Sequence, residues 1–314
     1  MKQRGPDRAD VAAAADRIAG QIRRTPVMSL SPAETGLPGT IVLKLENLQH
    51  SGSYKARGAL HSMLTLADET AGVCAASGGN HGGTVAWAAQ SAGLPADVFV
   101  PSTAPAVKVA RIRDYGATAH LVAGSVKEAL EECVAFSAKH GAALIHPYDT
   151  WETTAGAGTV GLEVAEQVPD ADVVLLACGG GGLYTGVAAA LAGSSRVQPV
   201  EPRLCPTLAE ALAAGEPVDV AVGGVAVDSL GAARIGELAL QTALAHEVRP
   251  VLVDEDDILA ARRYLWSALR MLAEPGACVA LAAALSGQID IPADSTAVVV
   301  VSGGNNETLP GSER

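Results

Sequence analysis

The 314-residue sequence is poor in positive charge, since 22 Lys and Arg stand against 34 Asp and Glu for a net charge of −12. A nucleic-acid partner is not expected, because phosphate neutralisation needs a basic face. Aromatic residues make up only 3% of the chain. The small side chains that dominate in their place suit close packing of helices on a sheet.

Long apolar runs and paired cysteines are also missing. Gly, Pro or a charged residue interrupts each apolar block, so no segment reaches the length of a membrane-spanning helix. The basic start of the chain leads into no apolar signal core. The five cysteines form no CxxC pair. We therefore expect no membrane-spanning segment, no disulfide framework and no zinc site. The cysteines are expected to be buried free thiols in a cytoplasmic protein.

What the chain does have is a globular composition, with 49% hydrophobic and 18% charged residues, and enough length for two lobes. Short apolar strands alternate with longer helical stretches, which predicts an α/β fold with largely parallel sheets. The predicted strands are 41–45, 72–76, 96–100, 118–121, 173–177, 198–201 and 296–301. The predicted helices are 10–22, 54–66, 82–92, 106–115, 125–140, 159–168, 185–192 and 257–272.

Glycine-rich connections follow three of these strands, at residues 77–83, 179–186 and 302–305. In open α/β sheets, ligands bind just outside the carboxyl ends of the strands. We therefore expect the three loops to gather on one side of their sheets and to form a ligand site.

Four consecutive glycines, Gly179, Gly180, Gly181 and Gly182, follow the predicted strand 173–177 and open a helix. Glycine lets the backbone adopt φ > 0 and bring several N–H groups to one anion. The helix start adds the positive end of its dipole. A tight turn without a ligand needs fewer glycines, so a phosphate site is favoured. The loop is not a P-loop, because no Gly-Lys-Ser/Thr ending follows.

Another glycine pattern, at residues 156–161, matches G-x-G-x-x-G. Residues 148–155 before it do not resemble a strand, and no acidic residue stands about 20 positions further on. Dinucleotide binding is therefore the weaker interpretation.

The loop of Ser77, Gly78, Gly79, Asn80 and His81 stands between a predicted strand and a predicted helix. Its backbone donors, hydroxyl and amide at a helix N-terminus can cradle a carboxylate. A plain helix cap explains the loop equally well when it is considered alone. His81 is a candidate base and equally a candidate structural or capping histidine.

Ser302 follows the apolar stretch 296–301. A serine at that strand end can donate a hydrogen bond to a neutral ring nitrogen. Considered alone, the loop is better explained as a polar chain end after a final strand.

Lys55 stands where a helix should begin, with Ser51 or Ser53 available as the N-cap. Tyr54 belongs to an apolar helix face that would anchor the first turn. An amine whose pKa falls on desolvation suits Schiff-base chemistry with a carbonyl. Without the glycine loops, an exposed helix lysine would be the better interpretation.

Taken together, these segments resemble the fold-type II pyridoxal-phosphate enzymes, and within them the threonine/serine dehydratase and serine racemase branch. The resemblance runs nearly from end to end, and the combination of motifs in this order is highly specific. The matching segments are residues 24–26, 44–49, 52–59, 146–149, 155–161, 179–183, 200–202, 274–275 and 302–305.

The resemblance implies two three-layer αβα domains with mostly parallel, twisted sheets and pyridoxal 5′-phosphate in the cleft between them. The large domain would comprise residues 1–71 and 147–314 and bind the cofactor. The small domain, residues 72–146, would carry the substrate-carboxylate loop.

The resemblance also assigns roles to single residues. Lys55 would form the Schiff base with the cofactor and remove the Cα proton, with Tyr54 beside it in the cofactor site. Gly179, Gly180, Gly181, Gly182 and Leu183 would hold the cofactor phosphate. Asn80 would bind the phenolic oxygen, and Ser77, Gly78, Gly79, Asn80 and His81 would bind the substrate carboxylate. Ser302 would face the pyridine nitrogen and leave it unprotonated, which favours expulsion of a β-leaving group.

Departures from the family pattern narrow the choice. Serine racemases carry a second serine, the base on the opposite face of the substrate, where this chain has Gly78. Efficient racemisation is therefore not expected. The branch's cation site pairs Glu201 with a second acidic residue, where this chain has Thr207, so no metal is predicted. Gly83 and Ala157 replace glutamines common in threonine dehydratases, which predicts an altered or wider pocket.

The sequence therefore predicts a cytoplasmic, homodimeric ammonia-lyase that performs α,β-elimination on a small L-β-hydroxy-amino acid such as L-threonine or L-serine. Its products would be a 2-oxo acid and ammonia. An amino-acid racemase and a β-replacement synthase of the same fold stay open as alternatives.

Overall fold

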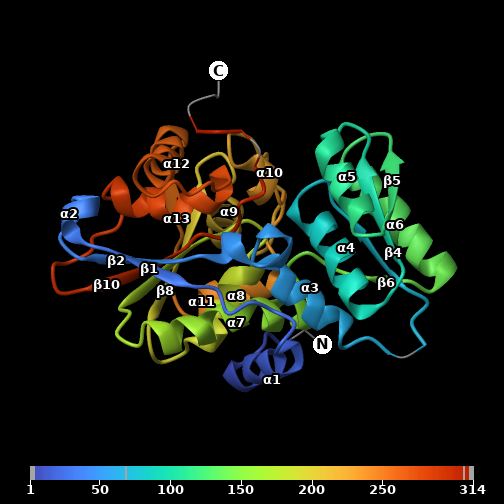
Figure 1. The fold of residues 1–314 in the computed structure, drawn as a ribbon, viewed down its shortest axis with the longest axis horizontal. Coiled ribbons are helices and arrows are strands. Elements are labelled where there is room, and N and C mark those ends of the chain that lie inside the picture. Colours follow the sequence, from blue (N-terminus) through green and yellow to red (C-terminus); the bar gives the residue numbers. More distant parts are fainter. Residues whose placement is uncertain (1–3, 68, 307, 311–314) are drawn as a thin grey trace.

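The computed structural model describes residues 4–67, 69–306 and 308–310. Two sheets lie beside each other in Figure 1. The larger has the order β1-β2-β10-β7-β8-β9 and is parallel except for the antiparallel pair β1–β2. Its strands are β1 (Val27–Leu30), β2 (Thr40–Lys44), β7 (Val173–Ala177), β8 (Arg196–Pro202), β9 (Val251–Val253) and β10 (Thr296–Val300).

The smaller sheet is parallel throughout, in the order β5-β4-β3-β6. Its strands are β3 (Val73–Ala76), β4 (Ala96–Pro101), β5 (Thr118–Val122) and β6 (Ala143–Leu144). The apolar side chains of β3 and β4 meet α3 (Lys55–Met63), α4 (Asn80–Ala92) and α5 (Ala106–Asp114) on one face, and α6 (Val126–His140) on the other. The sheet is therefore the middle of three layers.

Helices cover both faces of the large sheet as well. Val299 packs with α12 (Glu255–Leu269) and α13 (Pro275–Leu285). Its neighbour Val298 points the other way and packs with α7 (Trp151–Gln167), α8 (Gly182–Ala190), α9 (Thr207–Ala214) and α11 (Glu237–Ala245). Strands buried on both faces are continuous apolar runs, as in β7 and β10. The predicted α/β fold with two three-layer parts is confirmed.

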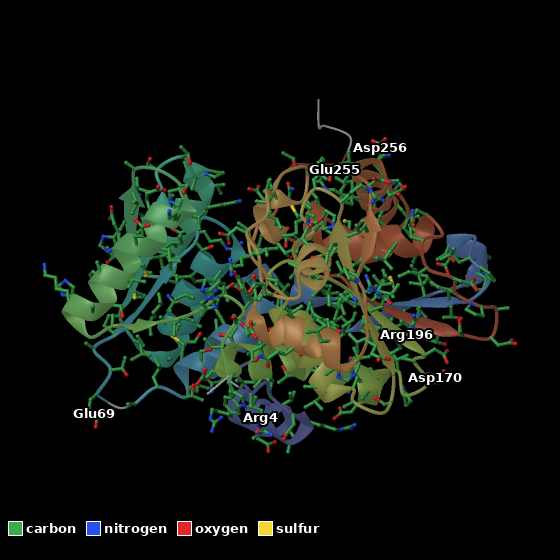
Figure 2. The ribbon with its side chains drawn as sticks, turned by 180° about the vertical axis from the view of Figure 1, so that it is seen from behind. Arg4, Glu69, Asp170, Arg196, Glu255 and Asp256 are labelled. Carbon is green, nitrogen blue, oxygen red and sulfur yellow. The ribbon has the colours of Figure 1, made fainter. Side chains whose placement is uncertain are left out.

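The remaining helical segments are short or peripheral. They are α1 (Arg8–Ile18), α2 (Pro32–Thr35), α10 (Val227–Leu230) and the 3-10 turns η1 (Glu46–Leu48) and η2 (His50–Gly52). In the ranges that the structure describes, no helix has both the length and the apolar character needed to cross a bilayer. Charged side chains such as Arg4, Glu69, Asp170 and Arg196 lie exposed at the periphery in Figure 2.

Every predicted strand is present, with ends shifted by one or two residues at most. The sequence did not predict β1, β6 and β9, which are short strands at the edges of their sheets. It also missed α13, because a helix that is apolar all round and buried over Pro275–Ala284 shows no periodic polar face. Helices α2, α9, α10 and α11 were missed as well.

The predicted helix 159–168 begins earlier, at Trp151, so the glycine pattern at 156–161 lies inside α7. A Cβ at Gly158 would lie 2.6 Å from the carbonyl oxygen of Gly186 in α8, and a Cβ at Gly156 would lie 2.8 Å from Cα of Gly58 in α3. These glycines allow three helices to approach closely. The pattern therefore has no strand–turn–helix context, in agreement with the sequence argument against dinucleotide binding.

Candidate active site

Lys55 is the first residue of α3, as predicted, but neither Ser51 nor Ser53 caps the helix. The N-cap is Tyr54, and no side chain bonds to the first turn. The chain is held here by the loop after β10 instead. Tyr54 N–H donates to the carbonyl oxygen of Ser302 over 3.1 Å, and Ser53 pairs with Gly303 in an isolated β-bridge. Backbone hydrogen bonds therefore hold the segment that carries Lys55 against the C-terminal loop.

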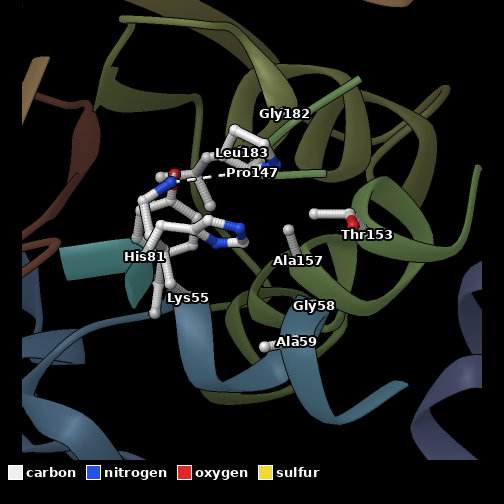
Figure 3. A pocket seen from close by; sticks show the side chains of 10 residues that line it. Lys55, Gly58, Ala59, His81, Pro147, Thr153, Ala157, Gly182 and Leu183 are labelled. Atoms are coloured by element: carbon white, nitrogen blue, oxygen red, sulfur yellow. Dashed lines mark hydrogen bonds between the residues drawn. The ribbon is translucent and has the colours of Figure 1, made fainter. Parts of the chain in front are cut away.

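The amine of Lys55 meets neutral oxygens. Nζ lies 3.3 Å from the hydroxyl of Tyr54 and 3.3 Å from the carbonyl oxygen of Pro147. Figure 3 shows Lys55 among the side chains that line a small pocket. The other residues that line the pocket come from α3, α4, α7 and α8 and the segments beside them: Gly58, Ala59, His81, Thr153, Ala157, Gly182 and Leu183. In the described part of the chain, no carboxylate pairs with this amine.

His81 lies buried beside Lys55 and donates through Nε2 to the carbonyl oxygen of Ile145 over 2.9 Å. Burial, with the positive charge of Lys55 nearby, lowers the pKa of His81 to about 3. The imidazole is therefore neutral at physiological pH and attaches the start of α4 to the segment after β6. These contacts favour the structural interpretation of His81; its role toward a carboxylate stays a prediction.

The tetraglycine loop connects β7 to α8, as predicted. Its carbonyl oxygens have partners: Gly179 O accepts from the Thr207 hydroxyl at 2.6 Å, Gly180 O from Gly236 N–H at 3.1 Å and Gly181 O from Thr185 N–H at 2.9 Å. Among the described residues, the N–H groups of Gly179, Gly180 and Gly181 donate to no protein acceptor.

A side chain would clash with its surroundings at two of these glycines. A Cβ at Gly180 would lie 2.3 Å from the ring of Tyr148. Gly181 has φ +88°, and its Cβ would lie 2.2 Å from Cβ of Ala239. Unpaired amides at the start of a nine-residue helix form a cradle for an anion. The loop therefore fits the phosphate of the implied cofactor.

The loop Ser77–His81 follows β3 and leads directly into α4, which begins at Asn80. Ser77 Oγ accepts from Gly79 N–H over 3.1 Å, and Gly79 is the N-cap. The first amides of α4 have no acceptor within the helix, which suits a carboxylate. Ser302 lies two residues after β10 and is 6% exposed. The roles of both loops toward substrate and ring nitrogen stay predictions.

Sequence reasoning assigned no role to Glu274 and Asn305, which bond to Asn80, or to Arg111, which bonds to Asn305. Asn80 Nδ2 donates to Glu274 Oε1 over 2.6 Å, and Asn80 Oδ1 accepts from Asn305 Nδ2 over 2.8 Å. Asn305 in turn accepts from Arg111. Burial raises the pKa of Glu274 to about 7, although the Asn80 hydrogen bond acts in the opposite direction. Glu274 and Asn305 stand in segments that match the family, but nothing local assigns them a role.

A buried ionic cluster forms around Arg57, two residues beyond Lys55 in α3. Both Arg57 and Glu46 are nearly inaccessible, and two hydrogen bonds of 2.8 Å join them. Glu163 accepts from Arg57 over 2.7 Å and also pairs with Lys44. Two cations and two anions balance one another, as buried charges require. The cluster ties α3, and therefore Lys55, to β2 and α7.

The segment that matches the family's cation site has a different construction here. Glu201 is fully buried at the end of β8, and its carboxylate accepts from Leu208 N–H at 2.6 Å and Ala209 N–H at 3.0 Å. Its Oε1 lies 3.0 Å from the Thr207 hydroxyl, whose single proton it shares with Gly179 O. Burial raises the pKa of Glu201 to about 7. Glu201 thus bonds to the start of α9, and Thr207 links it to the tetraglycine loop. Over the described ranges, no cluster of three His, Cys, Asp or Glu is placed to bind a metal.

Comparison with known proteins adds family information. The family model described as pyridoxal-phosphate dependent enzyme matches residues 18–303. L-threonine ammonia-lyase of Thermotoga maritima is 34% identical, over 94% of this chain and 75% of that protein. The structure of maize serine racemase has a TM-score of 0.90 at 34% identity, covering 96% of this chain and 94% of its own. The serine racemase of Dictyostelium discoideum has a TM-score of 0.88 at 31% identity, covering 96% and 99%.

Proposed function

The chain belongs to the pyridoxal-phosphate dependent enzyme family, and on this basis we propose that it is an ammonia-lyase for a small L-β-hydroxy-amino acid such as L-threonine or L-serine. The reaction breaks the Cα–H bond and the Cβ–O bond, and releases water. Hydrolysis of the resulting enamine gives a 2-oxo acid and ammonia. The observation that carries the proposal is the cradle of unpaired amides at Gly179–Gly181, because the next residues of the same loop, Gly182 and Leu183, line the pocket that Lys55 lines.

Each residue of the site has a separate role in the proposed reaction. When bound, the cofactor supplies an electron sink for the charge that develops at Cα. Lys55 removes the Cα proton, which is supported by the neutral oxygens that surround its Nζ. The amides of the tetraglycine loop would hold the phosphate, and those at the start of α4 would hold the substrate carboxylate. Asn80 would bond to the phenolic oxygen, and Ser302 would face the ring nitrogen.

Gly78 supports elimination over racemisation. Inversion at Cα needs a second group that carries a proton on the opposite face of the substrate, and glycine has none. A Cβ at Gly78 would lie 3.4 Å from Cβ of Ala104, which is ordinary contact, so space alone does not require glycine here. Because a serine racemase is also among the similar structures, racemisation is the second candidate. A β-replacement synthase is the third, because it shares the elimination half-reaction.

We also propose the domain boundaries, the compartment and the oligomeric state that were expected from the sequence. The two sheets would be the cores of two domains, residues 1–71 with 147–314 and residues 72–146. The five cysteines are free, which supports a reducing compartment such as the cytoplasm. The homodimer rests on the family resemblance, and sedimentation equilibrium of the purified protein tests it.

The test of function begins with the purified protein and pyridoxal phosphate. We expect a visible absorption band that survives gel filtration, and we expect Lys55→Ala to lose it. Lys139→Ala, on the exposed surface of α6, removes a lysine without entering the site and should keep the band. A wild-type protein that stays colourless and takes up no cofactor would overturn the assignment.

Substrate choice is tested with L-serine and L-threonine. We expect release of the corresponding 2-oxo acid and ammonia, with little D-serine from L-serine. D-serine as the main product would instead establish the racemase. Product formation only when a second nucleophile is added would establish the β-replacement synthase.

A further inference from the structure

A chain of side-chain hydrogen bonds runs through Arg111, Asn305, Asn80 and Glu274. Arg111 Nη1 donates to Asn305 Oδ1, and Asn305 Nδ2 donates to Asn80 Oδ1 over 2.8 Å. Asn80 Nδ2 then donates to Glu274 Oε1 over 2.6 Å. The four residues are far apart in sequence and come from α5, the C-terminal loop, α4 and the N-cap of α13. The chain therefore exists only in the folded protein.

Arg111 and the carbonyl oxygen of Ser51 determine the direction of the hydrogen bonds that Asn305 makes. A guanidinium can only donate, so Asn305 must direct its oxygen toward Arg111. The opposite side of Asn305 faces the carbonyl oxygen of Ser51, which can only accept, and Nδ2 donates to it over 2.9 Å. Asn305 therefore donates an N–H to Asn80, and the Asn80 side chain must accept it with its oxygen.

Asn80 is consequently fixed as a donor. Its oxygen accepts from Asn305, and one of its two N–H groups donates to Glu274. Among the contacts of the described residues, the second N–H has no protein acceptor. An amide in the opposite orientation would present an oxygen, which repels an anionic oxygen of a ligand.

The surrounding backbone is shaped for this arrangement. Ser51 adopts φ +55°, which is rare for a residue with a side chain. Its carbonyl oxygen accepts from both Arg111 and Asn305, and its hydroxyl pairs with Thr84 over 2.8 Å. At Gly52, with φ +72°, a Cβ would lie 2.2 Å from Asn305 Oδ1. A strained turn shortly before Lys55 is thus held by the two residues that orient Asn80.

We propose that Arg111 and Asn305 are positioning residues that hold the Asn80 amide as a donor toward an anionic oxygen of the bound cofactor. The inference rests on the proposed function, in which Asn80 contacts the phenolic oxygen. It adds that Arg111, which orients Asn80 through Asn305, makes the site favour the anionic form of that oxygen over the protonated form. Gly83 is part of the same construction, because a Cβ there would lie 3.7 Å from Cδ of Arg111, and a long side chain would compete with Arg111 for space.

Asn305→Asp tests the proposal with almost no change in shape. Aspartate still accepts from Arg111, but it cannot donate to Asn80 or to the carbonyl oxygen of Ser51. The Asn80 oxygen then faces an oxygen of the new carboxylate, and a rotated amide would place that oxygen against Glu274 Oε1 instead, so neither orientation keeps the bonds that hold Asn80 as a donor. We expect the dissociation constant for pyridoxal phosphate, measured by equilibrium dialysis, to rise about 10- to 100-fold, the effect of losing one hydrogen bond to a charged group. The visible band of the resting holoenzyme should shift toward the form with a protonated phenol.

Asn306→Asp is the matched control, one residue further along the chain. Asn306 Oδ1 accepts from Thr308 N–H over 2.8 Å and from the Thr308 hydroxyl over 2.6 Å. Aspartate can keep both bonds while it adds the same charge. We expect this variant to have the cofactor affinity and spectrum of the wild type.

Variants of Arg111 test the same idea from the other end and do not depend on a new buried charge. Arg111→Lys keeps an end that only donates, whereas Arg111→Gln can donate or accept and removes the fixed direction. We expect Lys to stay close to the wild type, and Gln to move in the direction of Asn305→Asp. The proposal is overturned if Asn305→Asp and Arg111→Gln bind cofactor with the affinity and spectrum of Asn306→Asp. A wild-type protein that binds no cofactor is a separate result, which contradicts the proposed function itself.

Discussion

Gly181→Ala should damage the tetraglycine loop in two ways that can be separated. The residue has φ +88°, which costs an alanine about 1–2 kcal/mol. The new Cβ would also lie 2.2 Å from Cβ of Ala239, and this atom cannot swing aside because it is attached directly to the backbone of α11. Overpacking of this kind adds about 1–3 kcal/mol. We expect the free energy of unfolding of the cofactor-free protein to fall by about 2–5 kcal/mol in total.

Gly193→Ala provides the control for the backbone contribution. Gly193 follows the same helix, α8, and has φ +81°, but a Cβ there would have no atom within 4 Å. It should therefore lose only the conformational part, about 1–2 kcal/mol. Urea unfolding, followed by circular dichroism and by Trp fluorescence, measures both variants. Equal losses for the two variants would refute the steric reasoning.

Cofactor affinity gives a second measurement on the same pair. The displaced loop of Gly181→Ala moves the amides of the cradle, so pyridoxal phosphate should bind more weakly. Gly193→Ala leaves the cradle in place and should bind as the wild type does. Weak binding by both variants would mean that the loss reflects general destabilisation and not the geometry of the loop.

Three further changes follow from the buried polar groups. Thr207→Val should lower the free energy of unfolding by about 1–3 kcal/mol in urea titrations, because Gly179 O loses its donor. Thr207→Ser keeps a hydroxyl and should retain the stability of the wild type. An equal loss in both variants would show that this hydrogen bond does not contribute to stability. The folded pKa of Glu201 lies at about 7, above the ordinary 4.5, so its contribution to stability is present below pH 4.5 and is lost as pH rises through 7. Glu201→Gln should therefore flatten the pH dependence of the free energy of unfolding over that range. An unchanged slope would contradict the raised pKa of Glu201. Arg57→Met should cost about 3–5 kcal/mol in thermal or urea unfolding by leaving the Glu46 carboxylate buried without its partner, and adding Glu46→Gln should recover part of the loss.

The groups that sequence could identify are those whose chemistry is contained in a few consecutive residues. The tetraglycine loop indicates an anion cradle because glycines, a preceding apolar strand and a following helix are all local. Lys55 was placed correctly at a helix start for the same reason. Its expected serine cap was wrong, because the backbone that holds Tyr54 comes from Ser302, at the other end of the chain.

Helix α13 illustrates a different limit. Its residues are buried on every side, so the sequence has no polar stripe from which a helical period could be detected. Glu274, its N-cap, was therefore identified only as part of a family motif. Its contact with Asn80 depends on the connection between α12 and α13 meeting the loop that follows β3.

The α/β class, the lysine at a helix start and the glycine loop could all be predicted from the order of the residues, because each rests on local periodicity or on consecutive residues. The orientation of the Asn80 amide could not, since it depends on the Arg111 guanidinium and on the amide of Asn305, 225 positions away in the chain. The bonds from Glu201 to a helix start and from Thr207 to the glycine loop likewise became visible only in the folded chain. The physical reason is the same in each case: a hydrogen bond has a direction and a length of about 3 Å, and only folding brings distant donors and acceptors within it.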